Sequence, residues 1–191
     1  PSSPLLSSLG VKITSHLDDD EDDATLQSLA DVCWALSRLN YHDANHATIF
    51  AHVSERAAGY VRTASPSQVS NLLYSFAKSD FCNDATLAAF DAVIRDRSRI
   101  IAGGNVKSTA QICWSFAKLS INPREFFDLV KERADEIKLV GSVFQISSIL
   151  YSFASLGLFD TAFFESVIVG SRGVVLEKAN NQDVSNILWA L

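Results

Sequence analysis

An aromatic residue set in the same short pattern recurs five times along the chain. The copies read DVCWALSRL (31–39), NLLYSFAKS (71–79), QICWSFAKL (111–119), SILYSFASL (148–156) and NILWAL (186–191). Successive aromatic positions are separated by 40, 40, 37 and 38 residues. A period of this length is typical of repeat proteins, in which each unit buries its apolar surface against its neighbours.

Each copy has the spacing of an amphipathic helix. Apolar residues lie five, two and one positions before the aromatic, at the aromatic itself, and two, three and five positions after it. This is a wide stripe at helical periodicity, so we place the aromatic in the buried part of a first helix. Nine residues after the aromatic stands a residue suited to start a second helix: Asp43, Asn83, Pro123 or Asp160.

The sequence thus predicts an all-α protein, an α-solenoid of stacked helix-turn-helix repeats of 37–40 residues. Residues 24–191 divide into about four and a half repeats, namely 24–63, 64–103, 104–141, 142–178 and a truncated 179–191. Residues 1–23 are expected to form a degenerate cap and an acidic linker. Because the chain has no methionine and its last residues continue a helical pattern, we interpret it as a segment of a longer protein.

The net charge of −6 belongs to one short segment. The chain has 22 Asp and Glu against 16 Lys and Arg, and six of the acids form the run at 18–23. Such a run suits a solvated connector or a site for a basic protein partner. An acidic protein normally repels polyanions such as RNA, but the neutral remainder of this chain weakens that objection.

Enzymatic patterns are absent from the sequence. Cys33, Cys82 and Cys113 form no C-x-x-C pair and are expected to be reduced core thiols. His42 and His46 lack the surrounding residues of a zinc motif, and no phosphate-binding loop occurs. We predict no catalytic residue, no metal site and no cofactor. No apolar run reaches the about 18 residues of a transmembrane helix, so no membrane insertion is expected.

The segments LLYSFAK (72–78), ICWSFAK (112–118) and ILYSFA (149–154) resemble the octotricopeptide and heptatricopeptide repeats of organellar RNA-binding proteins. The same repeat class resembles the helical region of FAST kinase-like proteins, and the Ser-Phe-Ala-Lys form is similar to repeats of alveolate mitochondrial proteins. The resemblance covers residues 24–191. It implies an α-solenoid, RNA as the ligand and a mitochondrial matrix location, with the plastid as the alternative. Such proteins often end in a RAP domain, which nothing in this chain matches, so no activity of that domain is carried over.

One face of each first helix is polar. Positions six before, three before, one after and four after the aromatic lie three or four residues apart and so share a face. Stacked repeats would turn these positions into columns, with amides and hydroxyls meeting base edges and cations meeting phosphates. The candidate RNA-binding residues are Asp31, Asn71, Gln111, Ser148, Asn186, Gln68, Ser108, Gln145, Arg38, Lys78 and Lys118. Helix caps on an ordinary solvated face are the alternative interpretation.

Arg95, Arg97 and Arg99 form the densest basic patch and are further candidates for contacts with RNA phosphates. A solvated helix end or a contact with a partner protein are the alternatives for this patch. We therefore predict a non-catalytic RNA-binding protein of mitochondrial RNA processing or stability, or a component of the mitochondrial ribosome. Its partners would be single-stranded or structured organellar RNA, including ribosomal RNA, and ribosomal or other assembly proteins. The alternative function is a protein–protein interaction scaffold within a large organellar assembly.

Overall fold

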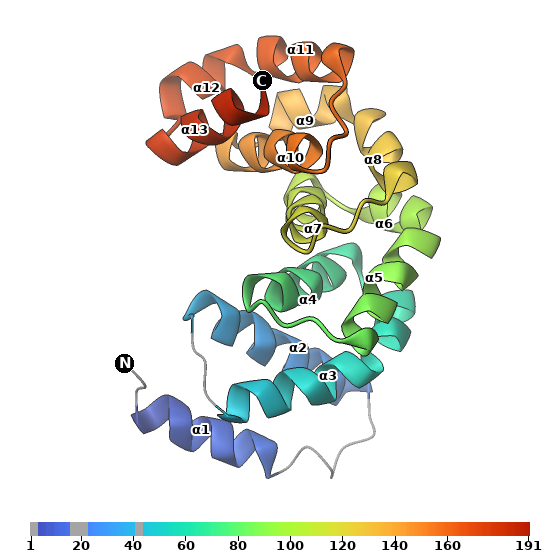
Figure 1. Ribbon diagram of the computed structural model, residues 1–191, viewed down its shortest axis with the longest axis vertical. Coiled ribbons are helices and arrows are strands. Elements are labelled where there is room, and N and C mark those ends of the chain that lie inside the picture. The colour runs from blue at the N-terminus through green and yellow to red at the C-terminus, as the bar shows by residue number, and fades with distance from the viewer. Residues whose placement is uncertain (1–3, 16–22, 41–43) are drawn as a thin grey trace. The chain divides into compact units, whose positions relative to one another are not determined.

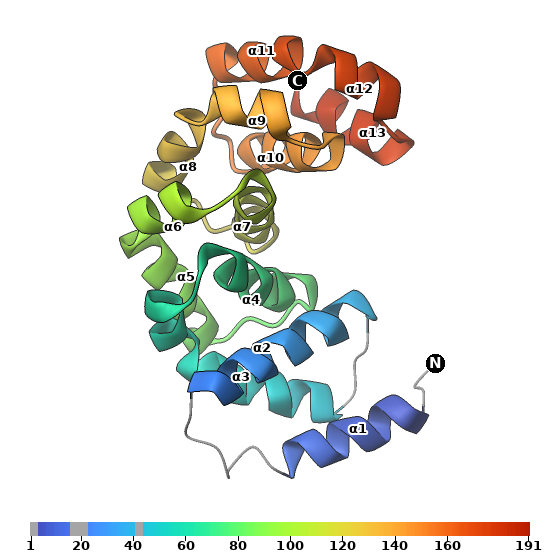
Figure 2. The ribbon, with the colours of Figure 1, turned by 180° about the vertical axis from the view of Figure 1, so that it is seen from behind.

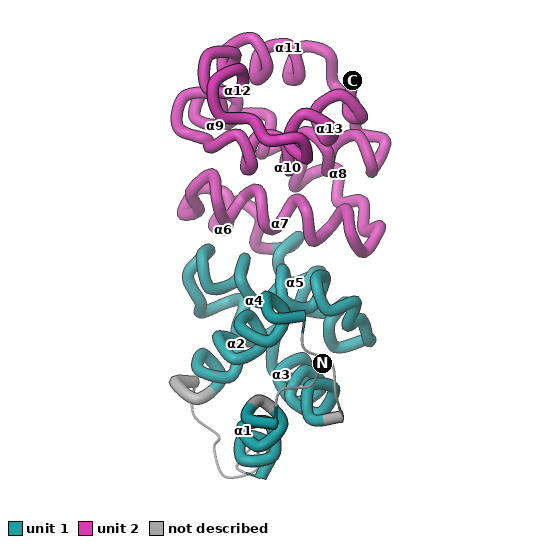
Figure 3. Tube along the Cα trace, turned by 90° about the vertical axis from the view of Figure 1, so that its left-hand side faces the viewer, with its two compact units in different colours: residues 1–95 teal, residues 96–191 magenta. Residues whose placement is uncertain are grey.

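The computed structural model describes residues 4–15, 23–40 and 44–191. These residues form thirteen helices and no strands, which confirms the all-α prediction. The chain divides into two compact units, residues 1–95 and residues 96–191 (Figure 3), and each is described by itself. Most of the acidic run, residues 18–22, lies outside the described residues.

The first unit consists of two layers of helices. Its helices are α1 (Pro4–Thr14), α2 (Asp23–Arg38), α3 (Ala44–Thr63), α4 (Pro66–Lys78) and α5 (Asp84–Arg95). The helices α2 and α4, which carry the aromatic motif, pack side by side, and α3 packs beside α5 (Figure 1). The first helix, α1, packs on α3.

The second unit repeats this two-layer arrangement. Its helices are α6 (Arg97–Gly103), α7 (Val106–Lys118), α8 (Arg124–Lys131), α9 (Ala134–Val140), α10 (Val143–Ser155), α11 (Thr161–Gly170), α12 (Arg172–Lys178) and α13 (Asn181–Ala190). The motif helix α10 packs against both α7 and α13, and α9 packs against α11 (Figure 2). We call the five motif helices α2, α4, α7, α10 and α13 the A helices, and the remaining helices from α3 onward the B helices.

Side-chain caps set where the A helices begin. Ser65, Asn105, Ser142 and Asn180 each stand nine residues before an aromatic, and each side chain accepts a hydrogen bond from the backbone N–H three residues later. These bonds satisfy backbone donors that have no partner inside the helix. The same spacing in four copies explains why the A helices start at equivalent places in the sequence.

The A helices also end in a repeated way. Asp80, Ser120 and Gly157 stand six residues after an aromatic and have φ values of +51°, +56° and +67°. The residue after each donates its N–H to the carbonyl of the phenylalanine five residues earlier, for example Ile121 to Phe116 at 2.9 Å. This is a Schellman motif, in which a left-handed residue stops the helix and turns the chain toward the next one.

The phenylalanine two residues after the aromatic forms the centre of the core. Phe76, Phe116 and Phe153 are each 0% exposed. In the second unit their rings connect successive hairpins: the Phe127 ring centroid lies 6.4 Å from that of Phe116 and 4.8 Å from that of Phe153. Phe153 in turn lies 4.8 Å from Phe163. A continuous set of ring contacts therefore joins the two layers of this unit.

The B helices of the second unit are interrupted, which the sequence did not predict. The segment 124–140 is split into α8 and α9, and the segment 161–178 into α11 and α12. Ser171, at the second interruption, is buried and its hydroxyl donates to the carbonyl of Val167 at 2.7 Å. Serine bonds of this kind to the preceding turn compete with the helix ladder and favour bending.

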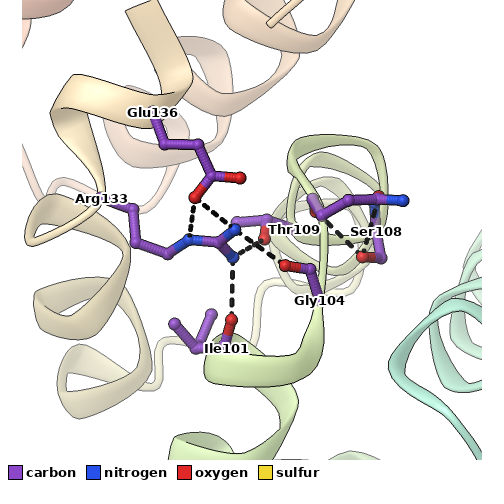
Figure 4. Close-up of polar contacts among 7 residues, drawn as sticks. Ile101, Gly104, Ser108, Thr109, Arg133 and Glu136 are labelled. Carbon is purple, nitrogen blue, oxygen red and sulfur yellow. Dashed lines mark hydrogen bonds and ion pairs between the residues drawn. The ribbon is translucent and has the colours of Figure 1, made fainter. Parts of the chain in front are cut away.

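Arg133, at the first interruption, ties three helices together (Figure 4). Its guanidinium donates to the carbonyls of Ile101 at 2.9 Å and Gly104 at 2.8 Å, and to the Thr109 hydroxyl at 3.0 Å. It also pairs with Glu136 at 2.6 Å, and its side chain is only 16% exposed. The planar fork of an arginine can reach several acceptors at once, so one side chain joins the start of α9 to the end of α6 and to α7.

Candidate nucleic-acid interface

In α4, α7 and α10 most side chains are buried and only a narrow strip faces solvent, whereas α2 and α13 are more widely exposed. The strip consists of the positions seven before, three before, at, and four after the aromatic, which we call the A ridge. These positions fall within about one sixth of a helical turn because their spacing is four, three and four residues. All of them are exposed or half-buried except Ser148, which is buried.

The aromatic residues of the motif lie on the A ridge and not in the core. Trp34, Tyr74, Trp114 and Tyr151 are half-buried, and Trp189 is 59% exposed. None of the five rings is fully buried, so the prediction that they occupy the buried stripe holds only in part. In the second, third and fourth copies the phenylalanine two residues later occupies that place, since two residues rotate a side chain by about 200° around the helix.

The row three residues before the aromatic is mostly accessible. Asp31 is exposed, and Asn71, Gln111 and Asn186 are half-buried. Ser148 differs, because it is buried and its hydroxyl donates to the carbonyl of Phe144 at 2.7 Å. One carboxylate and three amides of this row therefore lie at least partly at the surface.

The row six residues before the aromatic is engaged in helix caps. The side-chain oxygens of Gln68 and Gln145 each accept the backbone N–H of the capping serine at 2.9 Å, and the buried Ser108 hydroxyl donates to the carbonyl of Asn105 at 2.9 Å. The contacts of these three residues are therefore those of helix caps, as the alternative interpretation of the polar face expects.

The serines one position after the aromatic are buried, which corrects their placement on the polar face. Ser75, Ser115 and Ser152 are each 0% exposed. Each hydroxyl donates to the carbonyl four residues earlier at 2.6–2.7 Å. A hydroxyl satisfied in this way can be buried at little cost, so these serines serve the close packing of neighbouring helices.

Cations occupy the A ridge four residues after the aromatic. Arg38 is exposed and its guanidinium carbon lies 5.8 Å from the centroid of the Trp34 ring. Lys78 is half-buried and Lys118 is exposed. The structure adds Lys107, an exposed residue on the ridge of α7 that the sequence pattern did not single out. Lys107 stands seven residues before Trp114. It can be assigned to the ridge only when the aromatic is known to lie there.

The arginine patch is neutralised by carboxylates. Arg95 pairs with Asp91 at 2.6 Å, Arg97 with Glu125 at 2.8 Å, and Arg99 with Asp96 at 2.5 Å. Arg95 belongs to the first unit and the other two to the second. These ion pairs offset the positive charge of the patch, which makes it less suited to bind phosphate.

Charge is distributed unevenly between the layers of the second unit. Residues 96–191, all of which the structure describes, contain ten acidic residues. Asp183 is the only one of them within α7, α10 or α13; it is buried and accepts hydrogen bonds from the Ser147 hydroxyl and the Asn180 backbone. The exposed surface of these A helices therefore carries the cations Lys107 and Lys118 and no carboxylate.

The described cysteine and histidine side chains that could take part in catalysis or metal binding are buried or lie apart from one another. Cys33 and Cys113 are buried, and burial raises the pKa of each thiol well above its usual range. Cys82 is exposed, so the prediction that it lies in the core is wrong. His42 lies outside the described residues, and within the described residues no three His, Cys, Asp or Glu side chains are grouped to hold a metal ion.

None of the described helices combines the length and apolar character that crossing a bilayer requires.

Comparison with known proteins adds no relative. No protein-family model matches the chain, and no curated protein matches it significantly. The resemblance to octotricopeptide and heptatricopeptide repeats therefore stays a prediction from the sequence.

Proposed function

We propose that this protein is a non-catalytic RNA-binding α-solenoid that uses the A ridge as its binding surface. The proposal is carried by one observation: the exposed A surface of the second unit has two lysines and no carboxylate, although this unit contains ten acidic residues. Segregation of acids away from one face favours binding of a polyanion there.

The side chains of the A ridge match the groups that RNA presents. Lysines neutralise phosphates and release counterions, which supplies most of the affinity for nucleic acid. Amides such as Gln111 and Asn186 can donate to and accept from unpaired base edges. The mitochondrial matrix, with a role in RNA processing or stability or in the ribosome, is proposed from the sequence resemblance alone.

A charge-reversal experiment tests this proposal. We expect the Lys107→Glu/Lys118→Glu double variant to bind a fluorescein-labelled oligouridylate more weakly at low salt in fluorescence anisotropy. The dependence of log K on log salt should also become less steep, by about 0.7 for each phosphate of the single strand that the variant no longer neutralises.

The matched control is Arg124→Glu/Lys178→Glu, which changes the net charge equally at two exposed positions on α8 and α12. This control should retain most of the affinity. Equal weakening in both double variants would mean that only total charge matters, and no binding by the unaltered protein at low salt would overturn the proposal.

A protein–protein scaffold is the second candidate. Exposed apolar side chains on the B helices favour it, since Leu139 is 75% exposed and Leu176 is 76% exposed. Monomeric surfaces with apolar patches often serve partner proteins. Co-purification from mitochondria after ribonuclease treatment distinguishes the two: a partner that persists and depends on Leu139 and Leu176 supports the scaffold.

A further inference from the structure

The position of the aromatic rings on the A ridge calls for a reason. The second, third and fourth copies already have a fully buried phenylalanine two residues later, namely Phe76, Phe116 and Phe153, so in these copies the core is filled without the ridge aromatic. A Trp or Tyr nevertheless occupies this partly exposed position in all five copies of the motif. Large aromatic rings left partly in water are available to pack against a ligand.

The rings lie beside polar groups of the A ridge. On the ridge of α7, Gln111 stands three residues before Trp114 and Lys118 stands four residues after it. On the ridge of α13, Asn186 stands three residues before Trp189. The Asn186 side-chain oxygen accepts a hydrogen bond from Gln182 at 2.9 Å on the exposed side of α13. A flat apolar face flanked by an amide and a cation is complementary to a nucleotide, with its base, polar edge and phosphate.

Rings from adjacent helices also meet at the surface. The centroids of Tyr151 on α10 and Trp189 on α13 are 5.0 Å apart with an interplanar angle of 39°. Tyr151 stays half-buried, and not fully buried, with this contact in place. A planar ligand that stacks on the accessible part of this ring pair does not have to separate the two rings.

We propose that Trp114, Tyr151 and Trp189 stack on unpaired nucleobases, so that the second unit binds single-stranded RNA in preference to duplex. This inference deepens the proposed function and rests on it. Bases in a duplex already stack on their neighbours and cannot offer their faces to a protein surface, whereas single strands can. Lys107 and Lys118 hold the phosphates of the same strand.

Tryptophan fluorescence gives a direct test. The chain has three tryptophans, so a Trp34→Phe/Trp114→Phe variant leaves Trp189 as its only tryptophan. Titration with oligouridylate should quench Trp189 emission in parallel with the anisotropy of the labelled strand. A blunt-ended RNA duplex of the same length should cause much less quenching and bind more weakly.

Affinity measurements on ring variants complete the test. Trp189→Ala and Tyr151→Ala should each weaken oligouridylate binding about tenfold, and Tyr151→Phe should restore most of the affinity because the ring is kept. Leu139→Ala is the control, since it removes an exposed apolar side chain from α9. Circular dichroism and urea midpoints verify that each variant is folded.

The outcomes separate this inference from the proposed function. If oligouridylate still binds but Trp189 emission and the affinities of the ring variants do not change, stacking is excluded while RNA binding stands. That result would leave the rings as a surface for a protein partner. Equal affinity for duplex and single strand would also overturn the inference, and absence of any RNA binding would overturn both.

Discussion

At the scale of single residues, the aromatic of the motif and the phenylalanine that follows it by two positions in three of the copies have different tasks. Phe116 is fully buried and touches the rings of Phe126 and Phe127, whereas Trp114 is half-buried on the A ridge. Removal of the Phe116 ring would leave a cavity among rings that cannot close around it. Removal of the half-buried Trp114 ring would leave a space that is open to solvent, and water can fill it.

We therefore expect Phe116→Ala to lower the free energy of unfolding by about 3–5 kcal/mol and Trp114→Ala to lower it by clearly less. Urea denaturation of both variants, with the slope m compared to confirm similar unfolding, measures the difference. An equal or larger cost for Trp114→Ala would show that its ring belongs to the core.

Residue patterns alone could not separate these two aromatics. The repeat, the helices and the buried phenylalanines were predicted, but both rings were assigned to one wide stripe because both are large and apolar. The serines one position after the aromatic were misplaced for the opposite reason. Their hydroxyls bond to the preceding turn, so a residue that looks polar in the sequence is suited to a close-packed contact.

At the scale of elements, A helices were easier to predict than B helices. The A helices have capping residues at a fixed distance before the aromatic, as Ser142 and Asn180 show, and local sequence encodes such caps. The interruption between α8 and α9 has no such local signal. It coincides with Arg133, whose partners Ile101 and Gly104 lie about thirty residues earlier, and contacts of this range cannot be inferred from periodicity.

The Arg133 contacts lead to a prediction at this scale. Arg133→Lys keeps the positive charge but has no planar fork to reach two carbonyls and a hydroxyl. We expect the free energy of unfolding to fall by about 1–3 kcal/mol, because buried acceptors lose their donors. Urea denaturation measures this change.

Arg172→Lys at an exposed position on α12 is the control for this substitution and should be close to neutral. If the two lysine variants unfold at the same urea concentration, the bonds that Arg133 makes to α6 and α7 contribute nothing to stability.

At the scale of the whole molecule, charge is partitioned along the chain as well as between layers. The net charge of −6 equals the charge of the run at 18–23. A compact block of negative charge lowers the local concentration of RNA around the protein, and the effect extends over about one Debye length.

Replacing the five acidic residues at 18–22 by Asn and Gln should therefore strengthen oligouridylate binding several-fold at low salt. The affinities of the variant and the unaltered protein should converge as salt is raised, because screening removes the long-range term. Fluorescence anisotropy across a salt series measures this effect. A difference that persists at high salt would instead indicate that the run contacts the RNA or the binding surface directly.

The phenylalanine contacts of the second unit limit how its hairpins can be exchanged. Phe127 touches Phe116 on one side and Phe153 on the other, so rings from successive hairpins share one tightly packed space. An engineer who transplants a single hairpin to change ligand preference would have to carry the matching rings across both junctions. Side chains of the A ridge can be substituted one at a time, whereas the phenylalanines of the core have to be transferred together.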